Sequence, residues 1–438
     1  MFEILKTTRT GWQALRTATK TLGSASVVAA LIGCAGGLGV AQTAGTLDTT
    51  FGTGGIVTTN PALIGGNPNA PDGGVVGTLT AIEQSNGDLA VVTGINTTAF
   101  PGLEVFGLVR YTSDGTLIGV TTASFFTDGV SSPIAVAMQS NGDIVVVGTA
   151  SASIDSATEF AMARFKPNGK LDTTFGNGGL VTTTLSGPFP SPSAVIVQAN
   201  GQILVGGFVN GSGVHKSGQT VLVRYNSNGS LDTTFGTGGI VEVQDGIASP
   251  AALAQLSNGS YLAVSGGTSV EFSSTGVLQS TVTPGQLVAA TQSGSGCCGP
   301  VLFQPNGDFV VAGEVPVGNS HIDSDARVSR FSETGVQDPS FSSTPFTFGG
   351  NSENETQAIA LQSNGQIVVG GITNGHGTPV TGGLARLNAN GDLDTTFANT
   401  GGLMSSQIIS GLLIQRDGKI VAVGGIDNNL VLERYLAN

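Results

Sequence analysis

Apolar and polar positions along the chain follow two alternating patterns, and both predict β-strands. The first is an apolar strand, a Gln, an Asn-Gly or Asp-Gly turn and a β-branched strand, as in AVAMQSNGDIVVVG at 135–148. The second is an apolar strand ending in Arg and an aromatic residue, a turn, and Leu-Asp-Thr-Thr-Phe-Gly, as in MARFKPNGKLDTTFGNGGLV at 162–181. Asn-Gly supplies the positive φ that a two-residue hairpin turn needs, and runs of Val, Ile and Leu are typical of half-buried or buried strands.

The two patterns together form one unit, and the sequence contains seven units about 55 residues apart. The turn glycines of the first pattern are Gly87, Gly142, Gly201, Gly259, Gly307, Gly365 and Gly418. Each unit supplies about four short antiparallel strands. Units of this length and strand count are typical of propeller blades.

The two ends of the chain predict how the seven units close. The C-terminal RYLAN at 434–438, followed by GTLDTTFG at 45–52, aligns without a gap with RYNSNGSLDTTFG at 224–236. The last unit therefore lacks its outer strand, and the N-terminal segment supplies one. Such closure removes exposed sheet edges, whereas a linear solenoid needs edge caps. We predict an all-β fold: a single seven-bladed β-propeller of four-stranded antiparallel blades over residues 45–438, closed by an N-terminal strand that completes the last blade.

The repeated LDTTFG…GG, QSNG and ARY elements resemble the delta-60 repeat proteins of bacteria over residues 45–438. This resemblance implies a propeller-like fold and an extracytoplasmic or surface setting. It implies no particular activity and no catalytic residues. Units one and four depart from the family pattern, with Leu117-Ile118 and Leu278-Gln279 in place of Leu-Asp. The sequence evidence for an outer strand is therefore weakest in these two units.

Composition agrees with a folded all-β chain. The 438 residues include 68 Gly and 17 Pro, and hydrophobic residues reach 39%. Glycine has no three-residue period, which excludes collagen, and the hydrophobic content argues against a disordered chain.

Residues 1–44 show the three-part pattern of a secretory signal peptide. Basic residues within 1–21 precede an apolar stretch at 22–40, and GVA at 39–41 offers a small-x-small cleavage site. The apolar stretch is Gly-rich and too short to cross a bilayer, so we expect no transmembrane span. We predict an exported protein that is periplasmic, extracellular or on the outer surface.

The three cysteines lie in two places. The sequence LIGC at 31–34 resembles a lipobox, so a second interpretation of the N-terminus is a lipoprotein signal ending at Cys34, with a lipid anchor on that residue. Cys297 and Cys298 are adjacent and close only a strained ring, so they do not staple the fold. They are either a loop pair of little consequence or a redox-labile vicinal disulfide.

The charge of the chain limits its partners. The formal net charge is −13, and the chain without residues 1–41 carries −16. An acidic body of this size repels phosphate backbones, so we expect no nucleic-acid partner. We expect a monomer.

The Arg and Asp of the second pattern occur together in five units. The pairs are Arg164 with Asp172, Arg224 with Asp232, Arg330 with Asp338, Arg386 with Asp394, and Arg434 with Asp48. Unit four has Glu271 and Gln279 instead, and unit one keeps Arg110 alone. Since Asp favours Asx-type turns and carboxylates pair with Arg, we predict a structural role. The alternative, calcium bound by the Asp loops, lacks the dense alternating oxygen ligands of such loops.

A Gln ends nearly every inner strand, which predicts a ring of glutamines near one mouth of the channel. These residues are Gln84, Gln139, Gln198, Gln304, Gln362 and Gln415, with Gln255 near the matching place in unit four. Their repetition favours a packing role.

The tight turns are nearly uniform, whereas the loops between second and third strands and between blades vary. All these variable loops fall on one face, which we predict to be the binding face because recognition commonly resides in loops on a rigid scaffold. Phe100, Phe125, Phe126 and Phe189 lie there. A contiguous apolar patch among them would mark a partner surface.

All three histidines fall in second-to-third loops, and His321 with Asp323 and Asp325 forms the best local cluster for a metal. The alternative is that these are solvated loop residues. No nucleophile elbow is present, and Glu83 is the one charged residue on the inner strands, so no acid–base pair is evident.

These observations favour an exported, non-enzymatic scaffold that binds a protein or glycan through its variable loops and needs no cofactor. Two alternatives stay open. One is a metal-dependent hydrolase or lyase, using Ca²⁺ or another divalent metal held by residues among His215, His321, Asp323, Asp325 and His376. The other is a structural component of the cell envelope or matrix.

Overall fold

The described secondary structure consists almost entirely of β-strands. The computed structural model describes residues 43–66, 75–96, 103–153, 155–187, 189–209, 218–243, 250–265, 268–282, 299–318, 323–342, 344–349, 353–374, 380–426 and 428–437. Two short 3₁₀ turns, η1 (Pro61–Ile64) and η3 (Phe397–Asn399), accompany the strands. Within these ranges no helix has the length and apolar character needed to cross a membrane.

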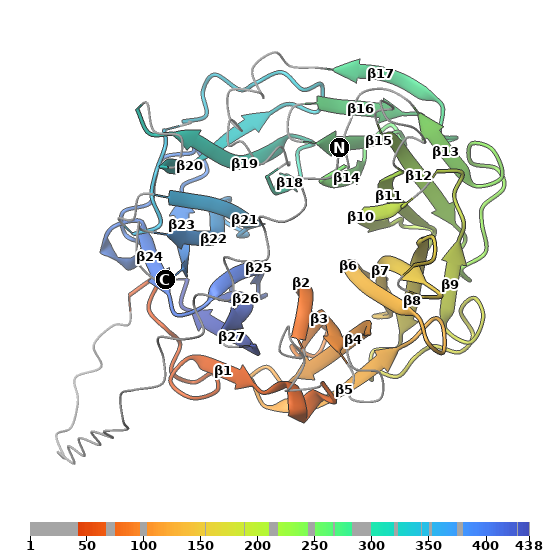
Figure 1. The fold of residues 1–438 in the computed structure, drawn as a ribbon. Coiled ribbons are helices and arrows are strands. Elements are labelled where there is room, and N and C mark those ends of the chain that lie inside the picture. The colour runs from red at the N-terminus through yellow and green to blue at the C-terminus, as the bar shows by residue number, and fades with distance from the viewer. Residues whose placement is uncertain are drawn as a thin grey trace, which may run out of the picture. The chain divides into compact units, whose positions relative to one another are not determined.

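The strands form seven blades, which we number from the sheet that contains β2 (Figure 1). Blade 1 contains β2 (Val75–Glu83), β3 (Leu89–Asn96), β4 (Glu104–Tyr111) and β5 (Leu117–Ala123). Blade 2 contains β6 (Val130–Met138), β7 (Ile144–Ser151), β8 (Glu159–Phe165) and β9 (Leu180–Thr183). Blade 3 contains β10 (Ser191–Val197), β11 (Ile203–Val209), β12 (Gln219–Tyr225) and β13 (Ile240–Val243). Blades 4 and 5 contain β14 (Ala252–Gln255), β15 (Tyr261–Ser265), β16 (Thr268–Phe272) and β17 (Leu278–Val282); β18 (Val301–Phe303), β19 (Phe309–Pro316) and β20 (Ser324–Phe331). Blades 6 and 7 contain β21 (Glu353–Leu361), β22 (Ile367–Asn374), β23 (Thr381–Leu387) and β24 (Gly402–Ser405); β25 (Ile408–Ile414), β26 (Ile420–Ile426), β27 (Asn429–Tyr435) and β1 (Ile56–Thr59).

The innermost strands of successive blades contact one another in a closed series. β2 contacts β6, and the series continues through β10, β14, β18, β21 and β25 back to β2. Residues 42–438 therefore form one compact unit with seven blades around a common axis (Figure 1). This confirms the predicted seven-bladed propeller.

The N-terminal strand completes the last blade, as the aligned ends predict. β1 pairs antiparallel with β27, with Val57 opposite Leu432. The pairing continues toward the chain ends, where Leu436 N donates to Thr46 O at 2.9 Å and Leu47 bridges to Tyr435. Blade 7 is thus built from both ends of the described chain.

The irregular blade is blade 5 rather than blade 1 or 4. The outer strands β5 and β17 both form, although the sequence pattern supports them least. In blade 5 a single bridge between Ala326 and Phe346 replaces the outer strand. The sequence FSSTPF at 341–346 lacks the FGxGG glycines, which in blades 2, 3 and 7 adopt positive φ and turn the chain into the outer strand. Blades 5 and 6 join through the parallel pairing of Ser324 with Glu353, giving one seven-stranded sheet.

The core lies between the blades, because each blade buries both faces. Val91 on β3 packs with Val421 and Val423 of blade 7, whereas its neighbour Val92 packs with Val146 of blade 2. Full burial of such a side chain stabilises the fold by about 1.5–3 kcal/mol. The two opposed faces explain why the second strands are nearly continuous apolar runs.

Candidate functional site

The first–second and third–fourth turns lie at one end of every blade, which we call the turn face. The second–third loops and the loops between blades lie at the other end, which we call the variable-loop face. The two faces differ in what their side chains do.

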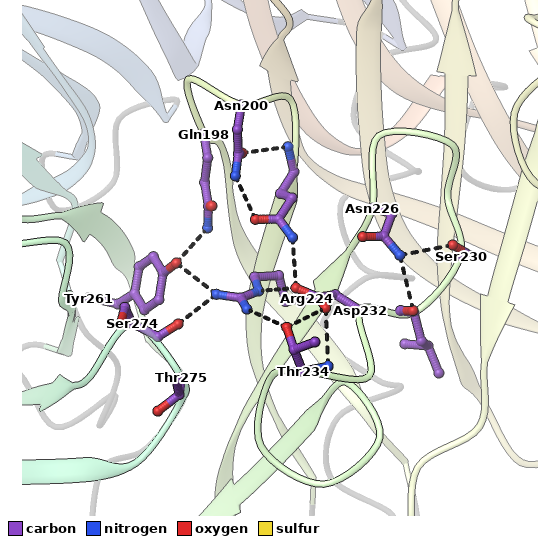
Figure 2. Close-up of polar contacts among 12 residues, drawn as sticks. Gln198, Asn200, Arg224, Asn226, Ser230, Asp232, Thr234, Tyr261, Ser274 and Thr275 are labelled. Atoms are coloured by element: carbon purple, nitrogen blue, oxygen red, sulfur yellow. Dashed lines mark hydrogen bonds and ion pairs between the residues drawn. The ribbon is translucent and has the colours of Figure 1, made fainter.

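An ion pair between an Arg and an Asp of the same blade recurs on the turn face. We call this pair, together with the partners described below, the clasp. In blade 3, Arg224 Nε donates to Asp232 Oδ2 at 2.7 Å (Figure 2). The other oxygen, Oδ1, accepts from Thr234 N at 3.1 Å and Thr234 Oγ1 at 2.7 Å. This is an Asx turn, which accounts for the Asp-Thr-Thr sequence. The carboxylate thus fixes the turn with one oxygen and the arginine with the other.

The same arginine reaches into the next blade. Arg224 Nη1 donates to Ser274 O at 2.6 Å and to Tyr261 Oη at 3.1 Å, both in blade 4 (Figure 2). Gln198, at the end of the inner strand of blade 3, donates to the same Tyr261 hydroxyl at 2.8 Å. The clasp therefore connects neighbouring blades through charge-assisted hydrogen bonds.

All five Arg–Asp pairs of the sequence form this contact, at distances from 2.6 to 2.9 Å. They are Arg164–Asp172, Arg224–Asp232, Arg330–Asp338, Arg386–Asp394 and Arg434–Asp48. In each, the arginine also donates to a turn carbonyl of the following blade. The acceptors are the carbonyl oxygens of Ser227, Ser274, Ala389, Ala437 and Ser113 respectively.

The Phe of the Leu-Asp-Thr-Thr-Phe motif is a third member of the clasp. The guanidinium carbons lie 4.3 to 4.9 Å from these ring centroids, as with Arg164 over Phe175. The ring also packs beneath the turn of the next blade, where a Cβ on Gly229 would lie 3.0 Å from Phe175. Sequence analysis missed this role, although the Phe is absent from the same two units that lack the Arg–Asp pair.

The clasp carboxylates are held in their charged form. Burial acts to raise the pKa of Asp172, but hydrogen bonds from Thr174 and Arg164 outweigh it and lower the pKa to about 2. Hydrogen bonds from Ser340 and Arg330 likewise lower the pKa of Asp338 to about 2. The pairs are therefore ionised throughout the physiological pH range.

Two of the seven blade junctions depart from the clasp. Arg110 of blade 1 has no Asp in the matching position, yet it still donates to Asn168 O of blade 2 at 2.8 Å. In blade 4, Glu271 replaces the arginine and accepts from Ser260 within its own blade at 2.6 Å. The junction of blades 4 and 5 thus has no clasp.

The glutamines also connect blades on the turn face. Gln84 donates to Pro167 O at 2.7 Å and Gln362 to Gly418 O at 3.0 Å, each in the following blade. Blade 4 differs from the sequence analysis, because Leu256, not Gln255, occupies the matching turn position and Gln255 is exposed.

The residues proposed for chemistry are described only in part. Asp325 lies on β20, where burial raises its pKa, and Asp323 immediately precedes this strand. His215, His321, His376, Cys34, Cys297 and Cys298 lie outside the described residues. Within the described part of the chain no three His, Cys, Asp or Glu residues are grouped to hold a metal ion. The metal, disulfide and lipid-anchor interpretations stay predictions.

Two cavities of about 400 Å³ lie between blades. One, on the turn face between blades 2 and 3, is lined by Gln139, Asp143 and Arg164, whose charged groups pair with each other or with Asp172. The other, at the outer edge between blades 5 and 6, is lined by Phe346 and Leu393 and lies where blade 5 lacks its outer strand. Both follow from blade packing.

The phenylalanines named for the variable-loop face differ in exposure. Phe125 packs edge-on against Phe106 at 4.9 Å, and both Phe125 and Phe126 are partly buried on the core. Phe189 is 62% exposed with a positive φ of 53°, while Phe100 lies outside the described residues. Among the described residues, the large apolar side chains exposed on the variable-loop face are those of Leu63, Phe189, Val317, Val380 and Ile426.

Comparison with known proteins identifies the repeat. Residues 139–175, 198–235 and 362–397 match the profile of the family described as "Domain of unknown function (DUF5122) beta-propeller". The chain carries DUF5122 β-propeller repeats. Each matched DUF5122 repeat begins at the inner-strand Gln and ends at or next to the clasp Phe, so it spans the residues that join one blade to the next.

Solved structures resemble the chain only distantly. A structure of Ycf48 bound to a D1 peptide is 12% identical with a TM-score of 0.46, covering 90% of this chain and 100% of that one. The WD40 propeller domain of Doa1 is 14% identical at 0.45, with coverage of 83% and 97%. The Pan2 WD40 domain of Neurospora crassa is 12% identical at 0.43, with coverage of 87% and 94%. No protein of curated function matches the sequence.

Proposed function

We propose that this DUF5122 propeller is an exported, non-enzymatic scaffold whose variable-loop face binds a protein or glycan partner. The observation that carries the proposal is the contrast between its faces. On the turn face the repeated polar residues are engaged in joining blades. On the variable-loop face the loops differ from blade to blade and expose large apolar side chains, an arrangement that favours recognition.

Phe189 supports the choice of face. Its side chain is 62% exposed, and its φ of 53° is a region that a bulky residue rarely adopts. Backbone strain of this kind concentrates at binding sites, where surrounding structure maintains it. Export is supported by the signal-peptide pattern of residues 1–44.

Site-specific photo-crosslinking in the producing cell tests the proposal. A photoreactive amino acid replaces Leu63 or Phe189 on the variable-loop face, or Val277 or Val336 on the turn face. All four wild-type side chains are 62–67% exposed, so the two pairs are matched for accessibility. We expect a defined adduct from Leu63 and Phe189 only, with mass spectrometry distinguishing protein from glycan. Equal adducts from both faces, or none from the variable-loop face, would contradict the proposal.

A further inference from the structure

Basic side chains gather at one end of the propeller. Every described Lys and Arg except Arg327 lies on the turn face. These residues are Arg110, Arg164, Lys166, Lys170, Arg224, Arg330, Arg386, Arg416, Lys419 and Arg434. Six of the arginines are committed to contacts with the following blade. Lys216, in a variable loop, lies outside the described residues.

Acidic side chains from five blades gather at the opposite end. They are Glu104, Asp128, Asp155, Glu159, Glu242, Glu314, Asp323, Asp325, Glu353 and Glu355. All ion pairs found among described Lys, Arg, Asp and Glu residues lie on the turn face. Asp128, Asp155 and Glu355 are exposed on the variable-loop face without a described Lys or Arg at ion-pair distance. These three carboxylates therefore contribute negative charge that no Lys or Arg balances within the described part of the face.

The acidic residues also act on one another. Burial raises the pKa of Glu355, and the neighbouring carboxylates of Glu314 and Glu353 raise it further. Carboxylates that repel one another favour a partner of opposite charge. A surface lined by charges of one sign also concentrates ligands of the opposite charge.

We infer that the variable-loop face binds a basic polypeptide segment, rich in Lys and Arg, an inference that rests on the binding function proposed above. The carboxylates form charge-assisted hydrogen bonds with ammonium and guanidinium groups. Phe189, Val380 and Ile426 on the same face supply the apolar contacts that a polypeptide makes and a lone cation does not. The described carboxylates of this face repel an anionic glycan or nucleic acid.

A binding titration with a defined probe tests this inference. The probe is a fluorescent twenty-residue oligolysine, with oligoglutamate as the control ligand, measured by anisotropy at low and high salt. The loop-face variant combines Asp128→Asn, Asp155→Asn and Glu355→Gln. The turn-face control combines Glu333→Gln, Asp392→Asn and Asp417→Asn, which removes the same net charge from exposed positions. All six positions are exposed, so both variants retain the buried clasp.

We expect the wild-type protein to bind oligolysine with an affinity that falls as salt rises. Loss of three exposed charge contacts weakens binding about tenfold in the loop-face variant, and the turn-face control changes it less than twofold. Equal weakening in both variants means attraction by net charge alone and overturns the inference, as does absence of oligolysine binding. Displacement of oligolysine by micromolar Ca²⁺ alone also overturns it, because the face is then a metal site.

Crosslinking in cells and oligolysine binding test the proposed function and this inference separately. If Phe189 crosslinks a defined partner and the loop-face charge variant gives the same yield, the face binds a partner but not through basic residues. If the loop-face variant no longer binds oligolysine and no adduct forms in cells, the inference about basic ligands stands and the proposed binding function is wrong.

Discussion

At the residue scale, the clasp arginine of blade 3 meets four partners at once. Arg224 contacts the carboxylate of Asp232, the ring of Phe235, the hydroxyl of Tyr261 and the carbonyl of Ser274. Hydrogen bonds to charged groups contribute about 1.5–3 kcal/mol each, and a cation–π contact adds about 0.5–2 kcal/mol. The repeated Arg, Asp and Phe therefore hold neighbouring blades together.

Replacement of Asp172 by Ala tests the clasp directly. The change leaves the buried Arg164 without its carboxylate and removes the Asx turn, so we expect the free energy of unfolding to fall by about 2–4 kcal/mol. Urea denaturation measures the loss. Asp392→Ala, at an exposed turn position, should change stability by less than about 0.5 kcal/mol. Partner binding should be unchanged, and lost binding at unchanged stability would refute the structural role.

The lowered pKa values predict loss of stability in acid. Because the folded-state pKa of Asp172 is about 2, below its usual value near 4, the stabilisation is complete above about pH 4 and is lost as pH falls toward 2. Thermal unfolding between pH 6 and pH 2 measures this. Asp172→Asn should unfold at lower temperature at pH 6 and should show a smaller fall between pH 4 and pH 2. A parallel pH profile in the variant would contradict the assignment.

At the element scale, the junction of blades 4 and 5 is the weakest of the seven. It lacks the clasp because Glu271 and Gln279 replace Arg and Asp, and its strands are short. Segments with fewer inter-blade hydrogen bonds open more readily. This junction is where the ring should open first.

Hydrogen exchange tests this expectation. Amides of β16 in blade 4 should exchange faster than those of β12 in blade 3, which bears a complete clasp. The double substitution Glu271→Arg and Gln279→Asp restores the missing pair and should slow exchange in β16. Equal protection of β12 and β16 in the wild-type protein would show that the clasp does not set local stability.

The elements also show what sequence reasoning can and cannot predict. The blades were predictable because each unit repeats the same turn chemistry. The missing outer strand of blade 5 was not, because Asp338 and Phe341 keep the pattern and the change begins with the residues that follow. The inward packing of Phe125 on Phe106 follows from the pairing of β4 with β5, which the repeat pattern supports only weakly in this unit. The acidic face likewise consists of unrepeated loop and strand-end residues that only the closed ring brings to one side.

At the scale of the whole molecule, the shared blade 7 joins the beginning and end of the ring. After a first opening between blades 4 and 5, complete unfolding still requires separating β1 from β27 and breaking the clasp between Arg434 and Asp48. The shared blade should therefore slow complete unfolding.

Two circular permutants test the value of the shared blade. Both join residue 438 to residue 45. One opens the loop at 186–190 between blades 2 and 3, so that every blade becomes continuous. The other opens the turn at 332–336 of blade 5, so that both ends still share a blade through the Arg330–Asp338 pair and the bridge between Ala326 and Phe346. No arginine of blade 4 contacts this turn. We expect the first to unfold at least tenfold faster in denaturant, and equal rates would contradict this role of closure.

The position of β1 also constrains the order of events during biosynthesis. Residues 56–59 are made early, but their partner strand at 429–435 emerges about 370 residues later, about 20 to 75 s at ordinary elongation speeds. During that interval the last blade cannot form and the ring cannot shut. Until its partner is made, the strand at 56–59 exposes an unpaired edge, the kind of edge at which nascent chains aggregate.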